Sequence, residues 1–110
     1  MSATDLLARL RAQVGGSRDG ALLRFSIGNA LLGAGDTVAA AEAFREAIAF
    51  DSAYSAAWKL LGRALLEAGE RAQAASAWQH GVQAAQARGD VQAAKEMQVF
   101  LRRLGKTGGT

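Results

Sequence analysis

The amino-acid sequence repeats at an interval of 34 residues. When residues 21–54 are laid over residues 55–88, ten positions are identical, whereas chance agreement in a chain of ordinary composition is about one position in ten. The matched pairs include Gly28/Gly62, Leu31/Leu65, Gly35/Gly69, Ala40/Ala74 and Ala43/Ala77. A period of this length is typical of proteins that stack one small unit on the next, because a single unit cannot bury its own apolar face. The sequence therefore predicts two stacked units with a shared core.

Each unit carries two apolar stripes with the spacing of an amphipathic helix. In the first unit, Gly35 supplies the left-handed residue that ends a helix, and Asp36 is a good N-cap for the next one. Small side chains on one stripe face large ones on the other, which lets two antiparallel helices approach closely. The stripes of the first unit are Leu23, Ile27, Ala30, Leu31, Ala34 and Ala40, Ala43, Phe44, Ala47, Ile48; those of the second are Ala57, Leu61, Ala64, Leu65, Ala68 and Ala74, Ala77, Trp78, Gly81, Val82.

The composition favours helices throughout the chain. The 110 residues include no proline, the strongest helix breaker, and many alanines, the best helix formers. The length supports one domain with one core. We therefore predict an all-α fold, a short right-handed α-solenoid of about six helices in antiparallel pairs. Turns are expected near residues 15–19, 35–36, 51–53, 69–70 and 88–90.

The N-terminal flank also carries a helical pattern. Residues 4–14 place apolar side chains on one face, with Ser2 or Thr4 as the cap, and the glycines that follow break this helix before Asp19 begins the next one. When the segment is shifted back by one period, it takes the place of a repeat's second helix. We interpret it as a leading half-repeat.

The C-terminal flank is predicted to be a capping helix. Gly89–Asp90 is a stop–start pair, and a helix from Val91 to about Leu104 follows, with the polar outer face that the terminal unit of a solenoid needs. Residues 105–110 are expected to form a frayed tail. The single domain 1–110 is thus divided into an N-terminal helix, two repeats, a capping helix and a tail, at residues 1–20, 21–54, 55–88, 89–104 and 105–110.

The repeats carry a recognisable signature. The second unit reads Trp58, Leu61, Gly62, Leu65, Ala74 and Trp78, and the first reads Ile27, Gly28, Leu31, Ala40, Phe44 and Ala47 at the same spacings. This pattern resembles the tryptophan–leucine–glycine–tyrosine, alanine, phenylalanine signature of the tetratricopeptide repeat (TPR) family, over residues 21–88. The chain departs from the family pattern at five positions: Arg24 stands at the tryptophan position, leucines at the tyrosine position of both units, and Ser52 and Gln86 at the closing proline.

The sequence contains no combination of residues that predicts an enzyme. It has no cysteine and a single histidine, His80, so a metal site of the usual ligand types is not expected. Pairs of glutamates on exposed helix faces are expected to be solvated, because acid–base catalysis needs a pocket that separates their pKa values. The glycine-rich stretches lack the lysine and Ser/Thr of a phosphate loop. We predict no catalytic residues, no cofactor and no metal. The glutamate pairs are Glu42/Glu46 and Glu67/Glu70.

The charge distribution narrows the classes of partner. The net charge is +3, but the excess is spread along the chain, so binding to nucleic acid is the less favoured interpretation. No apolar stretch reaches the length of a signal peptide or a membrane span. We expect a cytoplasmic protein with no membrane association. Trp58 and Trp78 lie at packing positions of the repeat and are expected in the core, not on a platform for stacking bases.

The resemblance implies where a partner would bind. In this family the first helix of each repeat lines a concave groove, which takes an extended peptide or a partner helix. Some members hold a terminal carboxylate with an asparagine at the position of Asn29, but the lysine and second asparagine of that clamp are replaced by Phe25 and Leu60. Asn29, Lys59 and Arg63 would still suit a carboxylate, unless both cations are ordinary surface charges. The predicted groove residues are Leu22, Phe25, Asn29, Leu32, Lys59, Arg63 and Leu66.

Three functions follow from these observations. The leading one is a non-enzymatic protein-interaction module, adaptor-like or co-chaperone-like, that binds an acidic or mixed acidic–apolar segment in the groove. The alternative is a structural subunit whose apolar groove residues are buried by a second copy, as in a homodimer or a larger assembly. The third is a basic nucleic-acid binder, which would show a steep salt dependence.

Overall fold

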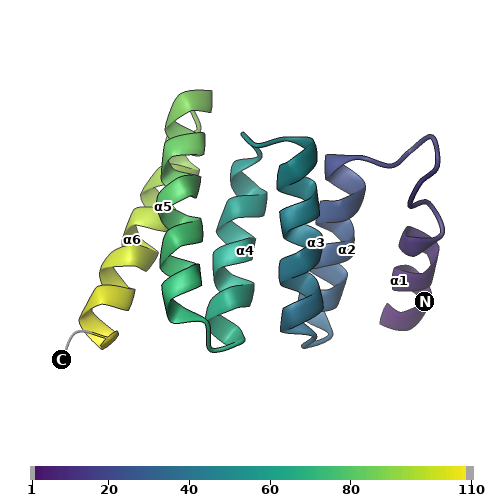
Figure 1. The fold of residues 1–110 in the computed structure, drawn as a ribbon, viewed down its shortest axis with the longest axis horizontal. Coiled ribbons are helices and arrows are strands. Elements are labelled where there is room, and N and C mark those ends of the chain that lie inside the picture. Colours follow the sequence, from purple (N-terminus) through teal and green to yellow (C-terminus); the bar gives the residue numbers. More distant parts are fainter. Residues whose placement is uncertain (1, 109–110) are drawn as a thin grey trace.

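The computed structural model describes residues 2–108, with side chains as far as residue 106, and this range contains six helices and no strand. Figure 1 shows the helices side by side in chain order, with the two termini at opposite ends of the row. Each helix packs on the next one along the chain, and α4 also contacts α2 and α6. The predicted all-α fold, a short right-handed α-solenoid of antiparallel helix pairs, is confirmed. The helices are α1 (Ala3–Arg11), α2 (Ala21–Gly33), α3 (Thr37–Phe50), α4 (Ser55–Glu67), α5 (Arg71–Arg88) and α6 (Val91–Gly108).

Left-handed glycines end the first helix of each repeat, as the sequence predicts. Gly35 and Gly69 have φ angles of 83° and 85°, a conformation that glycine adopts without the penalty of a Cβ. In the first repeat, the Asp36 N–H then donates to the Leu31 carbonyl at 3.0 Å, and the Asp36 carboxylate accepts from the Ala39 N–H to cap α3. These bonds fix the tight turn that makes α2 and α3 antiparallel.

The core of each repeat forms where a glycine on the first helix faces an aromatic ring on the second. A Cβ at Gly28 would lie 2.6 Å from the Phe44 ring, and a Cβ at Gly62 would overlap the indole of Trp78. Phe44 is fully buried and Trp78 is 3% exposed, so the prediction that Trp78 is a core residue is confirmed. The absence of a side chain on the glycine is what admits the ring, and this explains why both glycines stand at the same position of the period.

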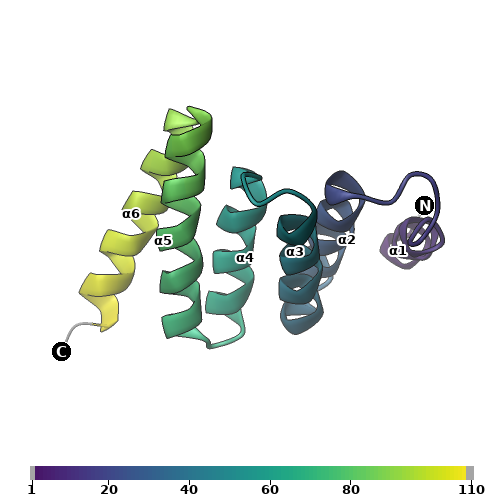
Figure 2. The same ribbon diagram turned by 45° about the horizontal axis from the view of Figure 1, so that its top comes forward.

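The N-terminal helix α1 packs on the edge of the first repeat. Ser2 caps it, because its hydroxyl accepts from the Asp5 N–H. No residue of α1 is fully buried, although Leu7 and Leu10 pack against the core. When the molecule is turned (Figure 2), α1 is seen almost along its axis while the other helices still run across the view, so it is inclined to the stack.

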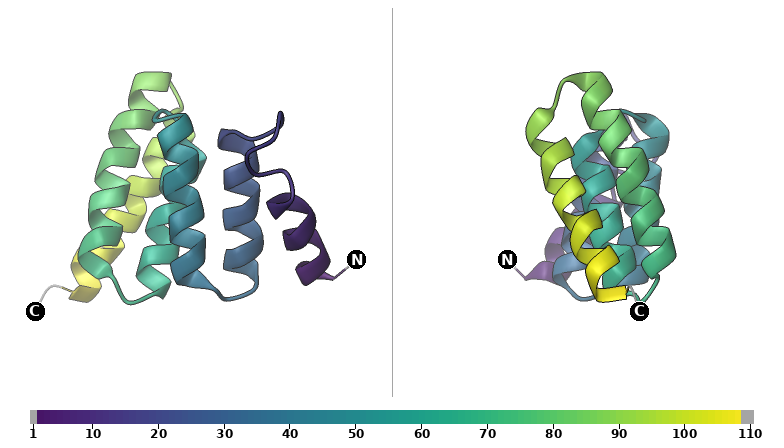
Figure 3. Two further views of the ribbon diagram at one scale, coloured as in Figure 1. Left: turned by 45° about the vertical axis from the view of Figure 1, so that its right-hand side comes forward. Right: turned by 90° about the vertical axis from the view of Figure 1, so that its left-hand side faces the viewer.

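At the other end, α5 and α6 form an antiparallel pair joined at Gly89, which Figure 3 shows from two further sides. Asp90 caps α6 by accepting from the Ala93 N–H at 3.1 Å and also accepts from the Ser55 hydroxyl at 2.7 Å. The side chain of Met97 is fully buried. The capping helix is therefore tied to both α4 and α5.

Three helix boundaries differ from the sequence prediction. Helix α1 ends at Arg11, before the predicted end near residue 14. Helix α2 begins at Ala21 after Gly20, and not at Asp19, because the Asp19 carboxylate is held by the Arg24 guanidinium and does not cap the helix. Helix α6 continues to Gly108, beyond the expected end near Leu104. Residues 109–110 of the predicted tail lie outside the described residues.

Candidate protein-binding surfaces

The predicted groove residues lie on α2 and α4, which together with α6 form what we term the first-helix face. On α2, Leu22 is 70% exposed and Asn29 is exposed, whereas Phe25 and Leu32 are half-buried. The Phe25 ring stacks on the Tyr54 ring with centroids 5.0 Å apart, and burial raises the pKa of that tyrosine. Part of the predicted apolar surface of α2 is therefore used for packing against the start of α4, where Tyr54 is the N-cap residue.

The two predicted cations of α4 each have an acidic partner within the chain. The Lys59 ammonium lies 3.1 Å from the Glu96 carboxylate of α6, and the Arg63 guanidinium lies 3.1 Å from Glu67, one turn along α4. The second pair is largely exposed, so it is screened by water and salt. Both cations belong to ion pairs on this face, and a partner carboxylate would have to compete with Glu67 or Glu96.

A mostly apolar hollow of about 400 Å³ opens between α4 and α6 on the same face. Leu66 and Phe100 line it, and the edge of Trp78 forms part of its wall. The Trp78 and Phe100 ring centroids are 5.2 Å apart. Arg63 and Glu67 lie at this hollow, and Arg71 and Arg103 line an adjoining one. The predicted Leu66 thus lines a depression. Phe100 and Arg103 were not predicted because α6 was assigned a capping role, and Arg71 was not because it begins α5, the second helix of its repeat.

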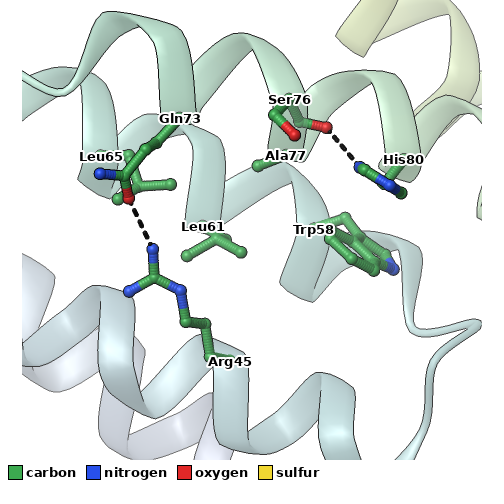
Figure 4. A pocket seen from close by; sticks show the side chains of 8 residues that line it. All are labelled: Arg45, Trp58, Leu61, Leu65, Gln73, Ser76, Ala77 and His80. Atoms are coloured by element: carbon green, nitrogen blue, oxygen red, sulfur yellow. Dashed lines mark hydrogen bonds between the residues drawn. The ribbon is translucent and has the colours of Figure 1, made fainter.

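A second hollow, of about 290 Å³, lies on the other side of α4, between α3 and α5. We call it the second-repeat groove. Figure 4 shows its residues pointing toward one another from these three helices, with Arg45 and Gln73 on one side and Trp58 and His80 on the other. It is lined by Arg45, Trp58, Leu61, Leu65, Gln73, Ser76, Ala77 and His80.

Stacked rings form one wall of the second-repeat groove. The Trp58 indole and the His80 imidazole lie nearly parallel, with an interplanar angle of 15° and centroids 5.6 Å apart. The indole N–H donates to the Ser52 carbonyl, and the His80 Nδ1 lies 2.8 Å from the Ser76 carbonyl, which orients both rings. Trp58 was expected in the core, but it is only half-buried. The expectation holds only in part, because the tryptophan lines a groove that is open to solvent.

The same groove exists one repeat earlier, between α1, α2 and α3. Eight of the nine residues lining this first-repeat groove lie 34 positions before the eight residues of the second-repeat groove. Arg24 takes the place of Trp58 there, and Glu46 takes the place of His80. The first-repeat groove is lined by Arg11, Val14, Arg24, Ile27, Leu31, Ala39, Glu42, Ala43 and Glu46.

Arg24, which departs from the repeat pattern, is the centre of a charge network. Its guanidinium makes two 2.9 Å bonds to Asp19 and lies 2.9 Å from the Glu46 carboxylate. The same group lies 5.6 Å from the centre of the Phe50 ring. The bonds from Arg24 and from the Gly15 N–H hold the pKa of Asp19 well below its usual range. This network anchors the loop between α1 and α2.

The buried polar side chains of the described residues are all hydrogen-bonded within the chain: no buried side-chain nitrogen or oxygen among them lacks a partner. Within residues 2–108, no group of three or more histidine, cysteine or acidic side chains could hold a metal ion. No helix in this range is long and apolar enough to cross a membrane.

Comparison with known proteins agrees with this geometry. A family model of the tetratricopeptide repeat matches residues 31–97. A TPR repeat-containing protein of Pseudomonas aeruginosa is 51% identical over 86 residues, which cover 78% of this chain and 82% of that protein. A Bordetella parapertussis protein, known from its solution structure, superposes with a TM-score of 0.80 at 46% identity, covering 92% of this chain and 88% of the other. A MamA crystal structure shares the fold at a TM-score of 0.72 and 23% identity, covering 94% of this chain and 59% of that one.

Proposed function

The chain belongs to the tetratricopeptide repeat family, and we propose that it is an adaptor-like or co-chaperone-like module that binds a peptide or helix of a partner on its first-helix face. The repeats of this family are generally non-enzymatic and mediate protein–protein interaction. The observation that carries the proposal is the hollow between α4 and α6, where Leu66, Trp78 and Phe100 present apolar surface. Such an apolar floor with a polar rim is typical of interaction sites.

The charges around the hollow support a partner of acidic or mixed acidic–apolar character. Three arginines, Arg63, Arg71 and Arg103, line the two adjoining hollows, and Glu67 is the one acid among the described residues that line them. A partner with carboxylates beside an apolar side chain would complement both the floor and the rim. Leu22, at the start of α2, is a separate exposed apolar side chain, 70% accessible, and does not line either hollow.

Two matched variants test this proposal. Leu22 and Arg63 are exposed, so Leu22→Ser/Arg63→Glu changes the first-helix face at little cost to folding. Lys59→Glu would be a poorer choice, because it would place a carboxylate beside Glu96 in a half-buried pair, whereas the Arg63–Glu67 pair is largely exposed and screened by water. The control is Leu6→Ser/Arg9→Glu, which makes the same chemical changes on exposed positions of α1.

The experiment begins with a protein captured by the wild-type chain from source-cell extract, which is then titrated against all three versions. The proposal predicts weaker binding, by about tenfold or more, only for the Leu22/Arg63 variant, and weaker wild-type binding at high salt. Equal affinity for the wild type and that variant would move the binding site away from the first-helix face.

A self-assembling structural subunit is the second candidate function. Its support is the set of exposed large apolar side chains, since Leu22, Val38, Phe50 and Val91 are between 56% and 70% exposed. Sedimentation equilibrium of the purified chain separates the two functions. A monomer at micromolar concentration would exclude the self-assembling subunit, and a dimer that is disrupted by Leu22→Ser would replace the adaptor proposal.

A further inference from the structure

The two repeat-related grooves are lined from equivalent positions but differ in their charged residues. Arg11 in the first-repeat groove and Arg45 in the second-repeat groove occupy the same position of the 34-residue period. Both grooves also keep an apolar floor, made of Ile27 and Leu31 in the first and of Leu61 and Leu65 in the second. The grooves therefore differ mainly in the side chains that surround the retained arginine.

The first-repeat groove contains its own acids. Glu42 and Glu46 line it together with Arg11 and Arg24, and the Arg24–Glu46 ion pair, at 2.9 Å, belongs to its wall. Two carboxylates thus face two guanidinium groups. An incoming anion would find Arg24 already paired with Glu46, and Arg11 in the same groove as two carboxylates.

The second-repeat groove keeps the arginine but loses both acids. Ser76 replaces Glu42 and His80 replaces Glu46, and none of the eight described residues that line this groove is acidic. The Arg45 guanidinium is exposed and donates to the neutral Gln73 side chain at 2.9 Å. Glu42 and Glu70 line an adjoining hollow that shares Arg45 and Gln73, but they do not line the second-repeat groove itself.

The remaining walls select the rest of the ligand. Leu61, Leu65 and Ala77 form an apolar floor, and the Trp58–His80 stack adds an aromatic wall. The volume of about 290 Å³ is at the lower limit of small-molecule sites, which run from roughly 300 to 1,000 Å³. The groove is thus better matched to one or two protein side chains than to a cofactor.

We propose that the second-repeat groove is a binding site for a partner protein's acidic residue flanked by an aliphatic or aromatic side chain. The carboxylate pairs with Arg45 and replaces the acids that the first-repeat groove supplies internally. The adjacent apolar side chain packs on Leu61 and Leu65 against the Trp58 ring. This site lies on the opposite side of α4 from the α4–α6 hollow, so the two proposals can be tested independently.

The probe is a phage-displayed library of random peptides, selected on immobilised wild-type protein in the presence of excess soluble Arg45→Gln protein. Peptides that bind other surfaces are removed by the competitor, because those surfaces are unchanged in it. Arg11→Gln is the matched control, since it changes the equivalent arginine of the first-repeat groove. Thermal melting verifies that both variants keep the wild-type fold, as expected for exposed arginines.

Binding is localised by NMR through the two tryptophans of the chain. Trp58 lines the second-repeat groove and Trp78 lines the α4–α6 hollow, so each indole N–H resonance reports one site. We expect enriched peptides to carry Asp or Glu beside an apolar residue and to shift the Trp58 resonance. Their affinity should fall about tenfold or more in Arg45→Gln and stay unchanged in Arg11→Gln.

Three results would overturn the inference. The first is a selection that yields no enriched peptide or only peptides without an acid. The second is equal affinity for wild type and Arg45→Gln. The third is a shift of the Trp78 resonance while the Trp58 resonance stays in place, which would assign the peptides to the first-helix face and leave the proposed function standing.

Discussion

The two repeats agree in their cores and differ on their surfaces. In both, a glycine on the first helix admits an aromatic ring from the second, Phe44 onto Gly28 and Trp78 onto Gly62. Where the core pattern recurs, the backbone arrangement recurs with it. The shared positions therefore describe how the chain folds and carry little information about what it binds.

The surface positions differ between the repeats and carry information about binding. At one position of the period the first repeat has Arg24, tied to Asp19 and Glu46, and the second has Trp58, stacked on His80. In the first repeat the arginine is paired with acids of the same chain, and in the second repeat the stacked tryptophan remains partly exposed to solvent. In a repeat protein, departures from the period are thus the places to search for function.

The largest expected effect concerns the shared core. Trp78→Ala and Phe44→Ala should each lower the free energy of unfolding by about 3–5 kcal/mol, because a buried ring is lost and a cavity is left. Both side chains are at most 3% exposed. Chemical denaturation of the two variants checks this. A loss below about 1 kcal/mol at either site would show that the two repeats are not packed alike.

A smaller effect is expected when the space for the ring is filled instead. Gly62→Ala places a Cβ into the Trp78 indole and strains the bond from Trp78 Nε1 to the Lys59 carbonyl, so we expect a loss of about 1–3 kcal/mol.

The control for this change is Gly33→Ala, where a Cβ meets nothing within 4 Å. That variant should gain up to about 1 kcal/mol from helix propensity. If denaturant melts place Gly62→Ala at or above the wild-type stability, the close glycine–indole contact is not what shapes the second repeat.

The charge network of the first repeat should make that repeat sensitive to acid. Since the folded-state pKa of Asp19 is held below its ordinary value of about 3.9 by Arg24, its contribution to stability is present in full above pH of about 4. It is lost as the pH falls further toward the folded-state pKa. Melting temperatures of wild type and Asp19→Asn should therefore differ at neutral pH and converge in acid. A constant difference across that range would contradict the assignment.

The smallest effect on stability is expected on the first-helix face. Leu22→Ser/Arg63→Glu removes an exposed side chain and an exposed ion pair, and such changes contribute about 0–1 kcal/mol. Its thermal melt should nearly overlay that of the wild type. A large drop would show that this face is needed for folding, and would remove the variant from use as a binding probe.

The core could be predicted from the sequence, because the constraint that makes it repeats. The period, the two stripes, the glycine stops and the burial of Trp78 all follow from the need to pack small positions against large ones. The predicted start of α2 was wrong because Asp19 suits a helix start by residue type, but its carboxylate instead pairs with Arg24 in the first turn of α2. The end of α6 was set too early because glycines usually end helices.

The candidate sites were less predictable, since they depend on contacts between helices that are distant in sequence. Nothing local to α4 indicates that Lys59 pairs with Glu96 of α6, or that Phe100 extends the surface around Leu66. The grooves flanking α3 are an exception. Their equivalence follows from the 34-residue shift, which aligns Arg11 with Arg45 and Glu46 with His80, although these residues lie outside the apolar stripes that determine the fold.

The most direct test of the proposed function is an NMR titration of the labelled chain with the partner captured by the wild-type protein. Trp78 borders the α4–α6 hollow, so binding on the first-helix face should shift its indole N–H resonance, and Leu22→Ser/Arg63→Glu should weaken that response. A partner that binds with full affinity and leaves the Trp78 resonance unmoved would contradict the assignment of this face as the binding surface.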